Sequence, residues 1–316
     1  MSISRVSTYQ LNKAFSNQIG NTQSKFNQLA AQIASGVAVS SMADNPVAAG
    51  SIIKANKQLE DIATYKDNIE SSGVEMSQVD STLKSINDQL SRAHDLAMQV
   101  SNGTMGEDEL KAYQSELNAI IDNVTRLANT KYNDKYLFSG TRTTTPPYAE
   151  NESGLLYDGN NESRSVLIGD NKTQSINVIG KNLFGEASFT TDAEGVITFD
   201  AAGSSGAIGA LYQFKAAIQD SGNVDLAAVK SAMGGITDGV DSITAGKTRM
   251  GAVGKVMEDM LSAYENDELN LTELRSNLQD ADLPSAISAW YSTYQSLQAS
   301  YSMMSKSMSS SLLDFI

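Results

Sequence analysis

The stretch that decides the fold is QIASGVAVSSMADNPVAAG, residues 32–50. It begins with small and apolar residues that suit a helix, continues through small polar residues, and then meets Pro46, the first proline of the chain. Proline costs about 3 kcal/mol inside a helix, so each proline is expected at a helix boundary. The stretch therefore predicts an early interruption between two long helices.

Apolar residues on both sides of this stretch alternate spacings of three and four, which is the pattern of a coiled-coil seam. After the stretch, seams run from Met76 to Val100 and from Leu110 to Leu127. They are separated by a turn at Asn102-Gly103, and Thr104 and Glu107 have the spacing of a capping box. Residues 50–130 are therefore predicted to form a helical hairpin. Before the stretch, the seam consists of Phe15, Ile19, Thr22, Phe26, Leu29 and Ile33.

The second half of the chain repeats the helical pattern from Leu226 to Tyr264. Between the helical regions, residues 139–205 contain short β-branched runs separated by Asp-Gly and Gly-Asn pairs, which indicate strands and turns. The predicted fold is mainly α, with long helices forming a terminal coiled coil and a helical rod or bundle. A small β-rich insert is expected to project from the middle of the chain. After Pro284, the last seam consists of Ile287, Trp290, Tyr294, Leu297, Tyr301, Met304 and Met308.

Length and composition exclude several classes of function. A chain of 316 residues corresponds to about two domains. Its net charge of −14 argues against nucleic acid as a partner, because phosphate binding needs clustered Lys and Arg. No apolar run approaches the ~20 residues of a membrane span, so membrane insertion is not expected. The N-terminus also lacks the features of a cleaved signal peptide.

Enzymatic chemistry finds no positive support in the sequence. The chain has one histidine, His94, expected on a helix surface, and no cysteine, which excludes a thiolate site and a multi-histidine metal site and leaves carboxylate or Ser-Lys chemistry open. Residues 239–248, GVDSITAGKT, end like a phosphate-binding loop, but Asp241 stands where that motif requires glycine. We therefore expect no catalytic residue, no cofactor and no metal.

The two ends of the chain carry few charges. Residues 1–43 contain three basic residues and no acidic one, and residues 286–316 contain only Lys306 and Asp314. A solvent-exposed helix normally carries many charged residues, so these ends are predicted to be enclosed in an assembly. Because one seam buries little apolar surface, they are expected to become ordered on assembly, pairing with each other and with neighbours.

Four segments carry a resemblance to a known family: MSISRVSTYQLNKAF (1–15), ASGVAVSSMADNPVAAG (34–50), the hairpin 101–148 and the ending 285–316. They resemble the flagellin superfamily and, within it, the family of hook-filament junction proteins, hook-associated protein type 3. The resemblance does not extend to the β-rich insert. It implies that the two terminal helices pair as an inner coiled coil lining the flagellar tube. The loop 34–46 would then carry the chain outward to a helical rod.

This resemblance assigns a layer-change loop and an assembly interface. In the loop, Gly36 can adopt a positive φ, Asp44 or Asn45 can cap the next helix, and Pro46 can occupy its first turn. The loop lacks the Lys or Arg that relatives often carry between Gly36 and Asp44. The interface on the inner coiled coil would comprise Phe15, Ile19, Phe26, Leu29, Ile33, Ile287, Trp290, Tyr294, Leu297, Tyr301, Met304 and Met308.

The sequence pattern and the resemblance together predict three domains. They are an inner coiled coil (1–43 with 285–316), a helical rod (44–138 with 206–284) and a small β-rich outer domain (139–205).

The function implied by the resemblance is a structural subunit of the bacterial flagellum that forms a junction ring. The implied partners are other copies of the chain, hook-associated protein type 1, flagellin, and an export chaperone bound at residues 286–316. The implied location is the extracellular flagellum, reached by the flagellar type III route without a cleaved signal.

Two alternatives predict different functions. A flagellin or minor flagellin-like filament subunit would share the architecture, although flagellins usually read Asp-Asp-Ala-Ala-Gly where this chain has ADNPVAAG. A secreted helical adhesin or translocon-type protein would instead bind surfaces or membranes, which needs a stronger apolar face than these serine-rich ends offer.

Overall fold

The computed structural model describes residues 8–103, 106–192, 196–219 and 224–313, and the chain divides into two compact units. The terminal unit consists of Met1–Asp61 and Asn266–Ile316, and the central unit of Ile62–Glu265. Both division points fall inside long helices, α2 (Pro46–Asn102) and α6 (Leu226–Gln279).

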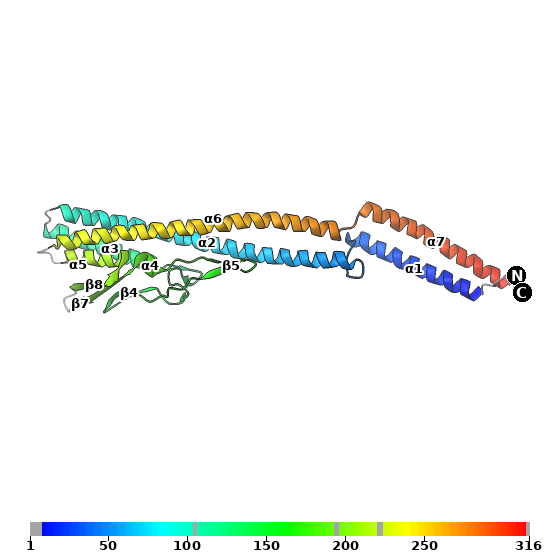
Figure 1. Ribbon diagram of the computed structural model, residues 1–316, viewed down its shortest axis with the longest axis horizontal. Helices are drawn as coiled ribbons and strands as arrows, with labels where there is room; N and C mark the ends of the chain where they lie inside the picture. Colours follow the sequence, from blue (N-terminus) through cyan, green and yellow to red (C-terminus); the bar gives the residue numbers. More distant parts are fainter. Residues whose placement is uncertain (1–7, 104–105, 193–195, 220–223, 314–316) are drawn as a thin grey trace. The chain divides into compact units, whose positions relative to one another are not determined.

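In the terminal unit, α1 (Thr8–Ser35) lies alongside α7 (Leu283–Leu313) (Figure 1). At the start of α7, the carboxylate of Asp282 accepts a hydrogen bond from the backbone N–H of Ser285 at 3.3 Å. Pro284 occupies the first turn, where its missing N–H leaves no helical bond unmade. The sequence therefore sets the start of α7 locally, by a side-chain cap and a proline.

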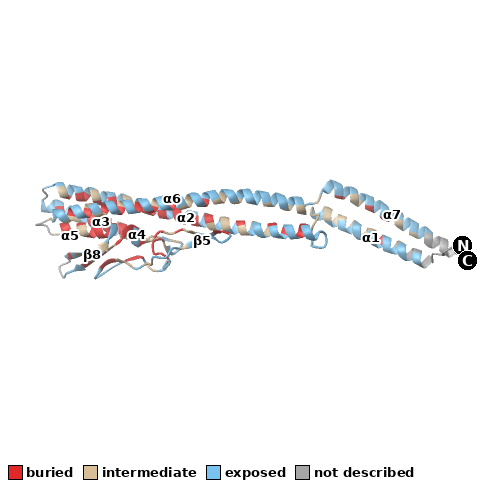
Figure 2. Cartoon of the chain, viewed as in Figure 1, coloured by how far each residue is buried: buried red, intermediate tan, exposed pale blue. Residues whose placement is uncertain are grey.

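In the central unit, α2 and α3 (Glu107–Ala128) form the predicted helical hairpin. The predicted α2 seam from Met76 to Val100 is buried at every position, and Figure 2 shows this buried stripe. The α6 seam lies in the same core, except that Leu226 at its start is 49% exposed. The mainly α fold predicted from three- and four-residue spacings is confirmed.

The α3 helix starts differently from the prediction. Thr104, the expected capping residue, lies outside the described residues. The helix begins at Glu107, and the N–H of the preceding Gly106 donates a hydrogen bond to the carboxylate of Glu109 at 3.2 Å. Three acidic residues fill the first turn, where the helix dipole favours negative charge.

The strands between the helices are short and antiparallel. One sheet has the order β3-β4-β7-β8, and two separate hairpins are formed by β1-β2 and β5-β6. A short helix, α4 (Gly180–Phe184), precedes β7, and α5 (Gly206–Ile218) follows β8. The strand bounds are β1 Lys131–Tyr132, β2 Lys135–Tyr136, β3 Tyr148–Asn151, β4 Gly154–Tyr157, β5 Ser165–Gly169, β6 Lys172–Ser175, β7 Glu186–Thr191 and β8 Ile197–Ser205.

The β-rich segment shares one hydrophobic core with the helices. Phe138, Tyr148 and Phe184 are fully or almost fully buried in the cluster that also contains the α2 seam. Its aromatic rings meet at short distances: the centroids of Phe138 and Phe184 are 5.0 Å apart. The structure thus groups residues 139–205 with the helices in the central unit, and their assignment to a separate outer domain stays a prediction.

Polar contacts also attach the β5-β6 hairpin to the helices. The guanidinium of Arg164, just before β5, forms an ion pair with Glu75 on α2. The hydroxyl of Tyr264 on α6 donates to the backbone C=O of Ile168 at 2.6 Å, and the Asn68 amide donates to the C=O of Leu167 at 2.9 Å. The hairpin is therefore held by both long helices of the central unit.

Candidate assembly interface

The predicted α1 seam faces α7 in the structure. Ile19 is buried, and the other seam residues of α1 are half-buried, whereas the positions between them are mostly exposed. On the opposite helix, Leu297 is buried. The half-buried residues of the α1 seam are Phe15, Thr22, Phe26, Leu29 and Ile33.

An aromatic cluster joins the last third of α1 to the first half of α7. The ring centroids of Phe26 on α1 and Trp290 on α7 are 5.2 Å apart in a stacked arrangement. Tyr294 stacks on Trp290 at 6.1 Å, one helical turn further along α7. Stacked aromatic pairs contribute about 0.5–1.5 kcal/mol beyond their buried area, so this cluster stabilises the α1-α7 pair by more than apolar burial alone.

One of the two rows of the predicted α7 seam is displaced by one residue. Leu297 of the predicted seam is buried, but Ala286 and Thr293 are buried beside Ile287 and Tyr294 of the other row, and Ile287, Tyr294 and Tyr301 are 50%, 40% and 51% exposed. Trp290 and Met304 are half-buried, and the side chain of Met308 lies outside the described ones. Both rows repeat every seven residues, so spacing alone does not separate them.

The exposed row leaves an apolar groove beside the helix pair. A cavity of about 310 Å³ is lined by Ala30, Ile33 and Ala34 of α1 and by Ile287 and Trp290 of α7. Among the described residues, those that line it carry no charge. Exposed apolar groups gathered on one face of a helix pair mark an interaction surface.

Backbone hydrogen bonds hold the layer-change loop to residues 279–281, at the junction between α6 and α7. Gly36 has φ +72, the left-handed conformation that glycine adopts at no steric cost. Its C=O accepts from the N–H of Ala281 at 2.9 Å, and the N–H of Ala38 donates to the C=O of Gln279 at 2.7 Å. Val37 and Asp280 form an isolated antiparallel bridge. Backbone hydrogen bonds therefore join the two connecting segments, 36–39 and 279–281.

Asp44 and Asn45 have different roles in the loop. Asn45 caps α2, because its side-chain oxygen accepts a hydrogen bond from the N–H of Ala48 at 3.1 Å, and Pro46 is the first residue of the helix. Asp44 instead accepts hydrogen bonds from the hydroxyls and N–H groups of Ser40 and Ser41 at 2.9–3.1 Å. These bonds lower the pKa of Asp44, with the Ser40 hydroxyl contributing most.

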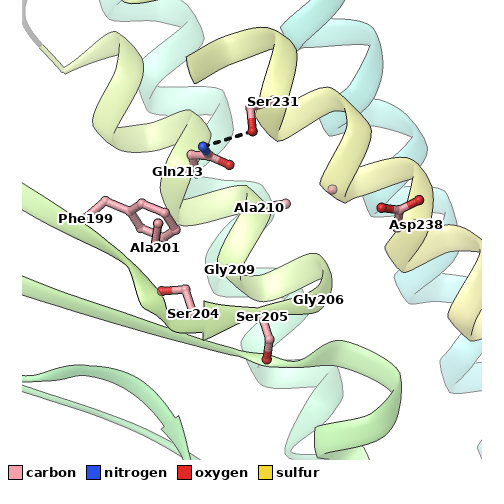
Figure 3. Close-up of a pocket in the computed structure, with 11 residues that line it drawn as sticks. Phe199, Ala201, Ser204, Ser205, Gly206, Gly209, Ala210, Gln213, Ser231 and Asp238 are labelled. Carbon is pink, nitrogen blue, oxygen red and sulfur yellow. Dashed lines mark hydrogen bonds between the residues drawn. The ribbon is translucent and has the colours of Figure 1, made fainter. Parts of the chain in front are cut away.

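A second hollow lies in the central unit between β8, α5 and α6 (Figure 3). It has a volume of about 340 Å³, and its lining includes Ser204, Ser205 and Asp238. Across it, the amide of Gln213 donates to the hydroxyl of Ser231 at 3.2 Å. The hollow borders a close helix contact: a Cβ atom at Gly239 of α6 would lie 2.5 Å from the Cβ of Ala207 on α5.

Two further structural findings concern chemistry and membranes. Within the described ranges, no group of three or more His, Cys, Asp or Glu side chains is arranged to hold a metal ion. His94 borders a surface hollow on α2 together with Ser91 and Asp95. None of the helices, as far as they are described, is both long and apolar enough to span a membrane.

Sequence reasoning missed the small residues of the interface. Ala286 and Thr293 occupy the buried row of α7, and Ser300 is half-buried seven residues further on. Their seven-residue spacing is visible in the sequence. The neighbouring row, Ile287, Tyr294 and Tyr301, contains larger apolar residues and therefore gives the stronger hydrophobic signal. Small side chains at the contact allow the helices to approach closely, which the hydrophobic pattern does not encode.

Comparison with known proteins agrees with this architecture. The family model for the bacterial flagellin N-terminal helical region matches residues 6–143, and the model for the C-terminal helical region matches residues 233–316. Flagellar hook-associated protein 3 of Escherichia coli is 23% identical over 305 residues, which cover 94% of this chain and 95% of the relative. Flagellin of Bacillus subtilis is 23% identical over 220 residues, covering 69% of this chain and 67% of the relative.

A solved structure of a flagellar hook-associated protein from Vibrio parahaemolyticus has the same fold, with a TM-score of 0.64 and 20% identity. The match covers 75% of this chain and all of that one. Together, the two flagellin models span both terminal helices, the α2-α3 hairpin and most of α6. The chain therefore belongs to the flagellin superfamily and, within it, to the family of flagellar hook-associated protein 3.

Proposed function

We propose that this chain is the structural subunit that connects the flagellar hook to the filament by forming a junction ring. The observation that carries the proposal is the length of its match: hook-associated protein 3 aligns along 94% of the chain, whereas the flagellin alignment covers 69%. The family is a structural component of the flagellum, so the chain acts by assembly and not by catalysis.

The helix pair α1-α7 supports a role as the inner coiled coil. It buries only one seam between its two helices and leaves Ile287, Tyr294 and Tyr301 exposed next to an apolar groove. In the ring, neighbouring subunits would cover this second row, so the twelve predicted interface residues would serve two contacts. Those buried toward α1 would hold the pair together, and those exposed on α7 would meet neighbours.

The proposed partners follow from the position of a junction. Other copies of the chain would form the ring, hook-associated protein type 1 would lie on the hook side, and flagellin would lie on the filament side. An export chaperone would bind residues 286–316 before assembly, because the exposed apolar row of α7 needs cover until then. The chain would reach the extracellular flagellum by the flagellar type III route, without a cleaved signal. The layer-change loop would separate an inner coiled coil (1–43, 285–316) from the outer domains.

Deletion of the gene tests the proposal against its alternatives. We expect cells with hooks but no attached filaments, and flagellin released into the medium, as seen by electron microscopy and by immunoblotting of the medium. Normal filaments would contradict a junction role, and they would favour a minor flagellin or a secreted adhesin.

A point substitution then tests the inner coiled coil. Leu297→Asp places an unpaired charge in the buried seam of α7. We expect it to prevent filament attachment when it replaces the wild-type chain, with the central unit still folded by circular dichroism. Leu226→Asp, at a leucine that is 49% exposed, is the matched control and should support filaments. Normal incorporation of Leu297→Asp would contradict the interface assignment.

A further inference from the structure

A short basic segment follows the last turn of α3. From Arg126 to Arg142 the chain has four basic residues and one acidic residue, a net charge of +3 within a protein of net charge −14. At its centre is the β1-β2 hairpin, which carries Lys131 and Lys135. We call these two lysines and their strands the basic hairpin.

The fold of this hairpin presents both lysines rigidly. Asn133 and Asp134 both adopt left-handed conformations, with φ 47 and 60, as a tight two-residue turn requires. Lys131 lies opposite Tyr136 in the register, and Tyr132 lies opposite Lys135, so each cation shares a strand face with a tyrosine. The Nζ of Lys131 is 4.6 Å from the centroid of the Tyr136 ring.

The described carboxylates of the chain do not neutralise these cations. Both lysines are exposed, and neither takes part in an ion pair among the residues that the structure describes. By contrast, Arg142 at the end of the segment pairs with Asp158 at 3.3 Å. Tyrosine is enriched at protein interfaces, whereas lysine is depleted there, so the two cations indicate a contact that is guided and held in register by opposite charge.

A surface of the opposite charge exists on the same molecule. From Glu258 to Glu273, α6 has six exposed carboxylates and no lysine or arginine. Glu258 and Asp259 at its start both pair with Lys255 at 3.1 Å, so the stretch from Glu265 to Glu273 is the part offered to a partner. A contact between two different surfaces of one kind of subunit is heterologous, and repeating it gives a ring where the rotation closes and a helical filament where it does not. The acidic stretch of α6 therefore fits the basic hairpin as a head-to-tail partner.

We propose that the basic hairpin of one subunit docks on the acidic stretch 265–273 of a second copy of the chain. This inference rests on the proposed ring. The contact guides and orients neighbouring subunits, and the apolar contacts of the terminal helices stabilise the assembled ring. Because exposed charges are screened by salt, the contact weakens as ionic strength rises.

Charge reversal tests the docking in cells that lack the native gene. Lys131→Glu with Lys135→Glu is expected to reduce the number of filament-bearing hooks about tenfold, because like charges then face each other. Adding Glu265→Lys and Glu273→Lys should restore much of the loss. The control, Lys172→Glu with Lys230→Glu, reverses two lysines elsewhere that are also exposed, and it should behave as wild type.

The outcomes separate this inference from the proposed function. If the wild-type gene restores filaments and the hairpin variant restores them equally well, the docking is wrong and the junction role stands. Rescue of the hairpin variant by basic substitutions in flagellin or in hook-associated protein type 1, and not in α6, would also overturn it. If deletion of the gene leaves filaments normal, the junction role itself fails.

Cross-linking in isolated hooks measures the contact directly, because the native chain contains no cysteine. Lys135→Cys combined with Glu265→Cys, treated with a short bis-maleimide, should give a ladder of covalent multimers. Each single-cysteine variant should give no species larger than a dimer. A double variant that cross-links only within one chain would overturn the proposal.

Discussion

The terminal and central units bury their apolar residues to very different degrees. In the central unit, one continuous cluster runs from Ile69 on α2 to Met257 on α6. In the terminal unit, the buried apolar residues are few and mostly small, while large apolar side chains stand exposed on α2, α6 and α7. Those exposed side chains are Val47, Ile53, Leu269, Leu274, Leu283, Ile287, Tyr291, Tyr294, Tyr301 and Met303.

This difference indicates where each unit obtains its stability. Burial of apolar surface contributes about 25 cal/mol per Å², so the central unit is stabilised mainly by its own core. The terminal unit has one seam and a row of apolar groups that its own described residues leave exposed. The sequence prediction that the ends become ordered on assembly has the same physical basis.

The largest expected effect is the difference in the free energy of unfolding when one buried leucine in each unit is replaced by alanine. Leu83 is fully buried and Leu297 is 7% exposed. We expect Leu83→Ala to cost about 2–5 kcal/mol of the free energy of unfolding, because it leaves a cavity in a closed core. Leu297→Ala should cost less than about 1 kcal/mol in the isolated chain, because the terminal helices open separately from the core. Guanidinium unfolding followed by circular dichroism measures both, and equal costs would contradict the comparison.

The core of the central unit was largely predictable, and the interface only partly. Every residue of the α2 seam is buried, because a long run of three- and four-residue spacings places its apolar residues on a single face of a helix. On α7, two heptad rows lie side by side, and the hydrophobic signal favours the row of Ile287 and Tyr294 over that of Ala286 and Thr293. Which row faces α1 depends on how closely the helices approach, and that is a tertiary property.

The β1-β2 hairpin shows a second limit of sequence reasoning. It lies within the range predicted as helical rod, 44–138, but its strands have only two residues each. Asn133-Asp134 between two Lys-Tyr pairs indicates a turn, but strands of two residues are too short to show the alternation of apolar and polar residues that identifies a strand. The missed element carries the exposed cations of the proposed docking surface.

A second prediction concerns the ion pair that attaches the β5-β6 hairpin to α2. Glu75 and Arg164 are 15% and 22% exposed, and burial lowers the pKa of Arg164. Glu75→Gln leaves a partly buried guanidinium without its counter-ion, and we expect a loss of about 2 kcal/mol in the stability of the central unit. Glu258→Gln, which breaks an exposed pair with Lys255, should change stability by less than about 0.5 kcal/mol.

Urea unfolding of both variants provides the measurement. Equal and negligible losses would show that the hairpin is held by apolar packing alone. A double variant, Glu75→Gln with Arg164→Met, should recover part of the loss, because it removes the unpaired charge as well.

A third, smaller effect is expected at the loop of the terminal unit. Gly36 has φ +72, and a methyl group added to its Cα would meet no other atom within 4 Å, so Gly36→Ala should introduce backbone strain of about 1 kcal/mol without a clash. Gly50 lies in the helix α2, also with open space around it, and Gly50→Ala should instead stabilise that helix by about 0.5–1 kcal/mol. Hydrogen exchange at Ala38 and Ala281 should become faster in the first variant and not in the second.

The smallest effect is a pH dependence of the same loop. Hydrogen bonds from Ser40 and Ser41 lower the pKa of Asp44 below its usual value of 3.8. A carboxyl group with a lowered pKa in the folded state stabilises the loop above the pKa of the unfolded chain, and this contribution is lost as the pH falls through the lowered value. The loop should therefore loosen only in acid, below about pH 4. NMR titration of the Ser40 and Ser41 amides measures it, and Asp44→Asn should abolish the titration. If the amide shifts titrate equally in that variant, another group controls the loop. The backbone hydrogen bonds between 36–39 and 279–281 would then hold the loop without Asp44.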